Sequence, residues 1–129
     1  MIEEKLECLF EEIKDYFKSL KINEINEKAP VDYVTNIDYS IDRYISEKLP
    51  KILPEANIFS EEQRSIKQDG IFWIIDPVDG THNLLANIPF YSVSIALCDS
   101  CGPIASGILD LNNNEIYTAT KSQGARKKW

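Results

Sequence analysis

The stretch Trp73-Ile74-Ile75-Asp76-Pro77-Val78-Asp79-Gly80-Thr81 places two carboxylates, a turn and a hydroxyl directly after an apolar run. The apolar residues predict a buried strand, and the Asp-Pro and Asp-Gly steps predict that the chain turns after Ile75. Such a turn can bring Asp76 and Asp79 to one side of the strand end, with the Val78 carbonyl between them. Oxygen ligands of this kind suit Mg²⁺, which binds one or two carboxylates and keeps several of its waters. The alternative is an ordinary β-turn that binds nothing.

A second acidic segment, Ser60-Glu61-Glu62, follows the short apolar run 56–59. We expect this run to be a strand as well, so that two strand ends side by side would bring Glu61 near Asp76 and Asp79. At an effective dielectric constant near 20, two carboxylates 4 Å apart repel each other by about 4 kcal/mol. A cation among them would remove this repulsion. A solvated acidic rim is the alternative, because exposed glutamates are common.

The order and spacing of these motifs resemble the inositol monophosphatase family of Mg²⁺-dependent, Li⁺-sensitive phosphatases. The string Asp-Pro-x-Asp-Gly-Thr after an apolar strand is the most specific of the matching signals. The resemblance extends over most of the chain, and the segments that carry it are 30–38, 60–62, 73–84, 88–97 and 115–125. It implies an α+β fold with two N-terminal helices packed on a mostly antiparallel sheet, which is the N-terminal part of the layered sugar-phosphatase fold.

The resemblance also implies roles for particular residues. The implied Mg²⁺ ligands are Glu61, Asp76, the carbonyl of Val78, and Asp79. The implied contacts with a phosphorylated substrate come from Glu61, Val78, Asp79, Gly80 and Thr81. Independently of the family, a turn that runs into a helix offers free N–H groups to an anion.

Three residues are implied to act in catalysis. Glu61 and Thr81 would orient the attacking water, and Asp38 would support that arrangement. An aspartate near the start of a helix is as often only a cap or a first-turn charge, so both roles remain open for Asp38.

The implied reaction is hydrolysis of inositol monophosphate or a similar small sugar phosphate by metal-activated water. Mg²⁺ ions can activate a water and neutralise charge on the leaving oxygen, so no covalent nucleophile is needed. One alternative is a 3′(2′),5′-bisphosphate nucleotidase of the same superfamily, which Ser60 favours, whereas Ile88-Pro89-Phe90 favours inositol phosphates. The other alternative is a catalytically inactive, metal-binding interaction module.

The single histidine and the cysteines offer no competing chemistry. His82 stands where the family often has a small hydroxyl residue, and we expect a partly exposed residue at a helix start. Cys98-Asp99-Ser100-Cys101 has the spacing of a redox pair or half of a zinc site. Gly102-Pro103 follows it between two alternating apolar runs, so we expect a hairpin turn, where neither role fits.

Composition narrows the setting of the protein. The chain has 129 residues, 43% of them hydrophobic, and a net charge of −7, which predicts a single domain over residues 1–129. The negative charge argues against nucleic acid or an anionic membrane as a partner. Three cysteines, an odd number, favour a reducing compartment. With no signal peptide or membrane span recognisable, we expect a cytoplasmic protein that binds a small phosphorylated substrate, with a homodimer as a further expectation.

Apolar spacing predicts the order of the elements. Residues 2–20 predict a helix, and a second helix should begin near Asp38 and stop near Pro50. The remaining expected elements are strands at 57–60 and 71–75, a short helix at 81–86, and an antiparallel meander at 91–97, 104–111 and 115–120. We expect the basic residues Lys121, Arg126, Lys127 and Lys128 to form a frayed tail.

Members of the family continue into a second region that carries another metal-binding aspartate in a Trp-Asp segment. This sequence stops at Trp129, and neither of its tryptophans precedes an aspartate. We therefore expect a C-terminally truncated domain. Such a domain would leave a sheet edge and an apolar face uncovered, which predicts association.

Overall fold

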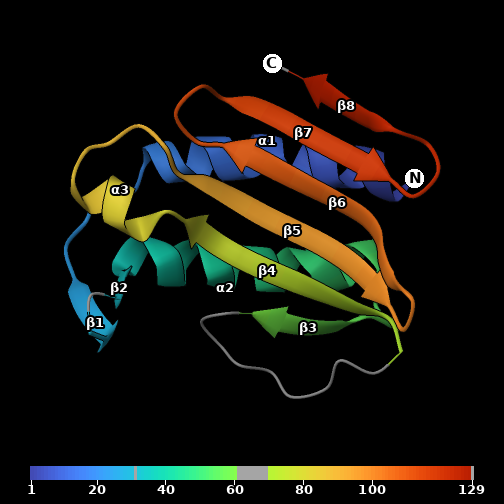
Figure 1. Ribbon diagram of the computed structural model, residues 1–129, viewed down its shortest axis with the longest axis horizontal. Helices are drawn as coiled ribbons and strands as arrows, with labels where there is room; N and C mark the ends of the chain where they lie inside the picture. Colours follow the sequence, from blue (N-terminus) through green and yellow to red (C-terminus); the bar gives the residue numbers. More distant parts are fainter. Residues whose placement is uncertain (31, 61–69, 129) are drawn as a thin grey trace.

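A six-stranded sheet carries two long helices on one of its faces in the computed structural model, which describes residues 1–30, 32–60 and 70–128 (Figure 1). The helices described are α1 (Ile2–Lys18), α2 (Asn36–Ile52) and α3 (Thr81–Leu85). The strands described are β1 (Ile25–Ala29), β2 (Asp32–Thr35), β3 (Asn57–Ser60), β4 (Phe72–Asp79), β5 (Ser92–Asp99), β6 (Gly102–Asp110), β7 (Glu115–Thr120) and β8 (Ala125–Lys128). The predicted α+β fold class is confirmed.

Neighbouring strands of the large sheet follow one another in the order β3-β4-β5-β6-β7-β8. Strands β3 and β4 run parallel, whereas the described pairs from β4 to β8 are antiparallel. The predicted meander is therefore confirmed, and the sheet is mostly antiparallel as expected. In the parallel pair Ser60 lies opposite Ile75, so both strands approach the same end of the sheet at these residues.

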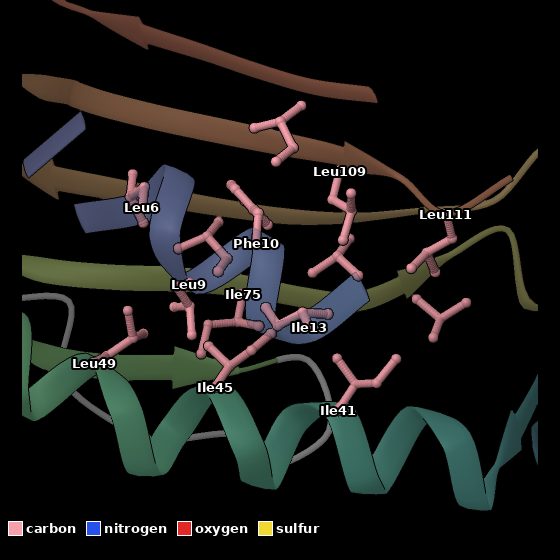
Figure 2. Close-up of a cluster of buried hydrophobic side chains, with 14 of the residues drawn as sticks. Leu6, Leu9, Phe10, Ile13, Ile41, Ile45, Leu49, Ile75, Leu109 and Leu111 are labelled. Atoms are coloured by element: carbon pink, nitrogen blue, oxygen red, sulfur yellow. The ribbon is translucent and has the colours of Figure 1, made fainter. Parts of the chain in front are cut away.

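The core lies between the two long helices and the sheet. Helix α1 contacts β6 and β7, and α2 contacts β4. Figure 2 shows apolar side chains from both helices and the sheet meeting in this space, and those labelled are Leu6, Leu9, Phe10, Ile13, Ile41, Ile45, Leu49, Ile75, Leu109 and Leu111. Full burial of one such side chain contributes about 1.5–3 kcal/mol. The helical spacing of the apolar residues thus identified the core-facing sides of α1 and α2.

Helix α2 begins with a capping box. The hydroxyl of Thr35 accepts hydrogen bonds from the N–H groups of Ile37 and Asp38, and the Asp38 carboxylate accepts one from the N–H of Thr35. Such reciprocal bonds satisfy N–H groups that a helix start would otherwise leave unpaired. The helix therefore starts at Asn36, slightly before the predicted position, and it continues through Pro50 to Ile52.

The hairpin of β1 and β2 was not predicted. Its strands pair antiparallel, with Ile25 opposite Thr35, and the whole of β1 is exposed. A strand that buries no residue has no reason to alternate apolar and polar side chains. The sequence pattern therefore showed only a polar stretch where β1 lies.

Strand β4 is longer than predicted. The sequence placed a turn directly after Ile75, but the strand continues to Asp79 and the chain turns at Gly80. The pairing with β5 shifts between Asp76 and Asp79. The Asp-Pro and Asp-Gly steps thus correspond to an irregular strand end, followed by a turn that begins later than expected.

The prediction of a frayed basic tail was wrong for residues 125–128. These residues form strand β8, which pairs antiparallel with β7, with Thr118 opposite Arg126. Arg126 also forms ion pairs with Glu3 and Glu7 of α1. The charges that suggested a disordered end instead bind this strand to the first helix.

Candidate active site

The candidate site lies where the end of β4, the start of α3 and the start of α2 meet. The Thr81 hydroxyl is 2.8 Å from Asp38 Oδ1 and 3.3 Å from the Val78 carbonyl oxygen. Thr81 and Asp38 are 43 residues apart in the sequence. The fold therefore brings Asp38 next to Val78 and Thr81, which lie in a separate segment of the sequence.

Asp38 accepts hydrogen bonds from two other residues, Thr35 and Thr81. Its Oδ2 atom accepts hydrogen bonds from the N–H of Thr35, at 3.0 Å, and from the Thr35 hydroxyl, at 2.6 Å. Its Oδ1 atom accepts the hydrogen bond from Thr81. The side chain is 1% exposed. The two roles left open by the sequence are therefore compatible, because one oxygen caps α2 and the other points to the candidate site.

An irregularity in β4 brings the two aspartates to one side of the sheet. Asp76 lies opposite Ser94 of β5 and Asp79 lies opposite Ser92, so β4 advances by one residue more than β5. In a regular strand, residues three apart point to opposite faces. Because Ser92 and Ser94 share a face, the extra residue places Asp76 and Asp79 on that same face.

The residues at this strand end fit a hard cation. Asp76 is partly buried, Asp79 is exposed, and Val78, whose carbonyl would be the third ligand, is buried. Carboxylate and carbonyl oxygens are the donors that Mg²⁺ prefers. Glu61 and Glu62 lie outside the described residues, and among residues 1–30, 32–60 and 70–128 no cluster of three histidine, cysteine or acidic side chains could hold a metal ion. The described donors are thus two carboxylates and a carbonyl.

Gly80 makes the turn that follows β4. Its φ is +97°, and a Cβ atom there would lie 2.7 Å from the carbonyl oxygen of Phe90. The Asn83 amide donates a hydrogen bond of 2.7 Å to the same oxygen. The backbone of the turn therefore packs directly against the segment that leads into β5, at a distance that only glycine permits.

A hollow of about 480 Å³ opens beside this turn. Asp79, Gly80 and Asn83 line one part of it, and Tyr91, Asp110 and Tyr117 are among its other lining residues. It is large enough for a small ligand. The hollow therefore gives a small molecule access to the exposed Asp79 carboxylate.

His82 and the cysteines are located as expected. His82 is exposed on α3, with its ring edge-on to that of Tyr33 at 5.2 Å between ring centres. Cys98 and Cys101 flank the β5–β6 turn, and both are free thiols. Burial, and secondarily the charge of Asp99, raises the pKa of the Cys98 thiol. A raised pKa leaves less thiolate at neutral pH, which is the opposite of what a reactive cysteine needs.

Thr35 and Asn83 were missed as parts of the site. Thr35 hydrogen-bonds Asp38, and Asn83 holds the carbonyl of Phe90. The spacing Thr35-x-x-Asp38 is itself a capping-box signature and could have located the first of these. The contact of Asn83 depends on a loop conformation that no local pattern indicates.

The family model described as the inositol monophosphatase family matches residues 4–128. A protein named Nus factor SuhB from Xylella fastidiosa is 34% identical over 110 residues, covering 85% of this chain and 40% of that protein. An inositol-1-monophosphatase from Rhizobium meliloti is 36% identical over 104 residues, covering 79% and 39%. The chain thus spans about two fifths of the length of these curated relatives.

Solved structures agree with these matches. An IMPase/NADP phosphatase complexed with Mg²⁺ and phosphate is 27% identical, with a TM-score of 0.85 over 96% of this chain and 49% of that one. An IMPase from Thermotoga maritima is 28% identical, with a TM-score of 0.84 over 94% of this chain and 48% of that one. The described fold therefore corresponds to about half of each of these solved chains.

Proposed function

The chain belongs to the inositol monophosphatase family, and on that premise we propose that the protein is a Mg²⁺-dependent phosphomonoesterase acting on inositol monophosphate or a similar small sugar phosphate. Membership supports a phosphatase kind of hydrolase. The observation that carries the proposal is the hydrogen bond of 2.8 Å between Thr81 and Asp38, beside the Val78 carbonyl. It joins a residue next to the candidate metal ligands to a buried carboxylate.

This hydrogen bond would prepare Thr81 to orient water. An ionised carboxylate only accepts hydrogen bonds, so Asp38 holds the hydrogen of the Thr81 hydroxyl on its own side. The lone pairs of the Thr81 oxygen are then available to accept a hydrogen from a water molecule. A water held in this way presents its own lone pair to the phosphorus of a bound monoester.

Asp76, Asp79 and the Val78 carbonyl would hold the cation, with Glu61 as a further ligand implied by the resemblance. When bound, Mg²⁺ would neutralise phosphate charge and help to activate the attacking water. The exposed Asp79 and the neighbouring Gly80 line the hollow, where we propose that the phosphate binds. A chain with net charge −7 attracts an anionic substrate poorly, so the cation would also recruit it.

The experiment that tests the proposal compares Thr81→Ala with Thr81→Ser in a phosphate-release assay with Mg²⁺. Loss of a positioned proton-transfer or water-orienting group costs about 10²–10⁴-fold in rate. We expect Thr81→Ala to lose at least the lower figure in kcat and Thr81→Ser to retain most of the activity, because serine keeps the hydroxyl. Equal activity of Thr81→Ala and the unsubstituted protein would contradict the assigned role.

Two other functions are carried as alternatives. The name of one solved relative, IMPase/NADP phosphatase, supports the nucleotidase alternative. The assay should therefore include a 3′,5′-bisphosphate nucleotide beside inositol monophosphate. The second alternative is the catalytically inactive interaction module, and it is worth testing because several relatives are named Nus factor SuhB. Mg²⁺ binding without phosphate release from any substrate of the panel would support that module.

A further inference from the structure

A second buried carboxylate of α2 lies outside the machinery described so far. Asp42 is 1% exposed, and its Oδ1 atom accepts a hydrogen bond of 2.6 Å from the hydroxyl of Ser60, which is 0% exposed. The two residues are 18 positions apart. A short hydrogen bond to a carboxylate, away from water, is among the stronger kinds in proteins.

The bond holds the end of a short strand. Strand β3 has four residues, and among the described strands it lies at the edge of the sheet and pairs with β4 alone. Ser60 is its last residue and lies opposite Ile75, the neighbour of Asp76. Asp42 thus holds the end of β3 beside the part of β4 that carries Asp76.

Asp42 and Asp38 form a pair on one helix. Residues four apart lie on the same face of a helix, and both aspartates are buried. Asp38 receives the hydrogen bond of Thr81, just beyond the end of β4, and Asp42 receives that of Ser60, at the end of β3. One face of α2 therefore holds both strand ends on which the proposed site depends.

We infer that Asp42 is a positioning residue of the metal site, which acts through Ser60 to set where β3 ends relative to Asp76. Asp42 touches neither the cation nor the substrate. The inference rests on the proposed function, because it assigns Mg²⁺ to this strand end. Partners that hold metal ligands in place typically change metal affinity by 10–100-fold when they are removed.

Mg²⁺ titration calorimetry of the unsubstituted protein and of Ser60→Ala tests this, at a temperature where circular dichroism shows both to be folded. We expect Ser60→Ala to raise the Kd for Mg²⁺ about tenfold or more. A bond that serves stability alone would lower the unfolding temperature but leave the Kd of the folded protein unchanged. An unchanged Kd would therefore overturn the inference.

The chain offers a matched control for this substitution. The hydroxyl of Ser46 also reaches Asp42 Oδ1, at 3.5 Å, but it lies on α2 itself and not on β3. Ser46→Ala removes a serine hydroxyl from the same carboxylate without releasing the strand, so its Kd should equal that of the unsubstituted protein. A Kd raised equally in Ser46→Ala and Ser60→Ala would count against the positioning role.

Two further variants keep the test open if Ser60→Ala does not fold. Asp42→Asn preserves the shape of the side chain but accepts a weaker hydrogen bond, so it should also raise the Kd. Ser60→Thr keeps the hydroxyl and should restore tight binding. An unchanged Kd in Asp42→Asn overturns only the inference about Asp42. Absence of Mg²⁺ binding by the unsubstituted protein overturns the proposed metal site as well.

Discussion

At the scale of single residues, Gly80 links the backbone of the candidate site to the loop before β5. Two features of this position favour glycine: its φ of +97° disfavours any side chain, and the Phe90 carbonyl oxygen lies only 2.7 Å from the position of a Cβ atom. Gly124 has a similar φ of +77° but no atom within 4 Å of its Cβ position. The two glycines therefore differ in crowding while sharing the same kind of backbone conformation.

We predict that Gly80→Ala destabilises the protein by more than Gly124→Ala does. A left-handed conformation costs a non-glycine residue about 1–2 kcal/mol, and this cost applies to both variants. Only Gly80→Ala must also displace the Phe90 carbonyl, so we expect its loss in free energy of unfolding to be larger by about 1 kcal/mol or more. Urea denaturation of the two variants measures the difference. Equal losses of unfolding free energy in the two variants would show that the Phe90 loop moves away from the added methyl group without an energetic cost.

The sequence could indicate residue types at the site better than their partners. The Asp-Pro-x-Asp-Gly-Thr string identified Asp76, Asp79 and Thr81 because turn chemistry and oxygen ligands are local properties of a sequence. The bond of Thr81 to Asp38 joins positions 43 residues apart, and only the packing of α2 against β4 determines it. The metal and substrate roles of Glu61, Asp76, Val78, Asp79 and Gly80 stay predictions.

At the scale of elements, α1 and β8 are joined by a row of charges. Glu3, Glu7 and Glu11 recur every four residues and therefore lie on one face of α1. Arg126 pairs with the first two, with N···O distances of 2.7 and 3.2 Å, and Lys128 lies 3.6 Å from the third. Alternation along β8 points both cations to the helix. The edge strand is thus fixed by its side chains as well as by its pairing with β7.

The ionisation of Glu3 makes the contact between α1 and β8 depend on pH. Hydrogen bonds from Thr120 above all, then from Thr118 and Arg126, hold the pKa of the Glu3 carboxyl below its ordinary value of 4.5. A lowered pKa means that the folded state favours the ionised form, so the stabilisation is complete above the unfolded pKa and is lost as the pH falls through the folded one.

We therefore predict that the unfolding temperatures of the unsubstituted protein and Glu3→Gln differ most above about pH 5 and converge as the pH falls below about 4. Thermal unfolding followed by circular dichroism across this range measures the gap. Glu4→Gln is the control, because Glu4 is exposed on the same turn and its replacement changes the net charge equally. A gap for Glu3→Gln that persists at low pH would refute the proposed cause.

Elements with an apolar face were predictable, and those without one were not. Both long helices and the strands of the meander were located because each buries one face in the core. Strands β1 and β8 are exposed along their whole length, so their sequences show no alternation of apolar and polar residues. β8 forms because the neighbouring strand β7 offers a pairing edge and α1 offers carboxylates, and α1 is distant in the sequence.

At the scale of the whole molecule, the two faces of the sheet differ. The helices α1 and α2 cover one face (Figure 1), and the cross-strand partners Ile108 and Tyr117 are 46% and 40% exposed on the other. Asp79 lines the same hollow as Ile108 and Tyr117, so this hollow lies on the uncovered side of the described sheet. No described helix is long and apolar enough to cross a membrane.

We predict that Mg²⁺ raises the unfolding temperature of the protein, because a ligand at 100 times its Kd stabilises the folded state by about 2.7 kcal/mol. Asp79→Asn should abolish most of this rise, since it removes one proposed carboxylate ligand. Asp15→Asn, an exposed position on α1, makes the same charge change outside the residues proposed to bind the cation and should retain the rise. If Asp79→Asn and the unsubstituted protein respond equally to a Mg²⁺ titration, Asp79 is not a ligand.

The ion pair between Glu3 and Arg126 has a consequence for the order in which the fold can be completed during synthesis. Its partners are 123 residues apart, and at 5–20 residues per second a ribosome needs roughly 6–25 s to make that length of chain. During this interval Glu3 has been made, while the strand that carries its partner does not yet exist. The helix at the start of the chain can reach its final environment only after β8 has been made. Residues of α1 are therefore locked in place only by a strand that is made 123 residues later.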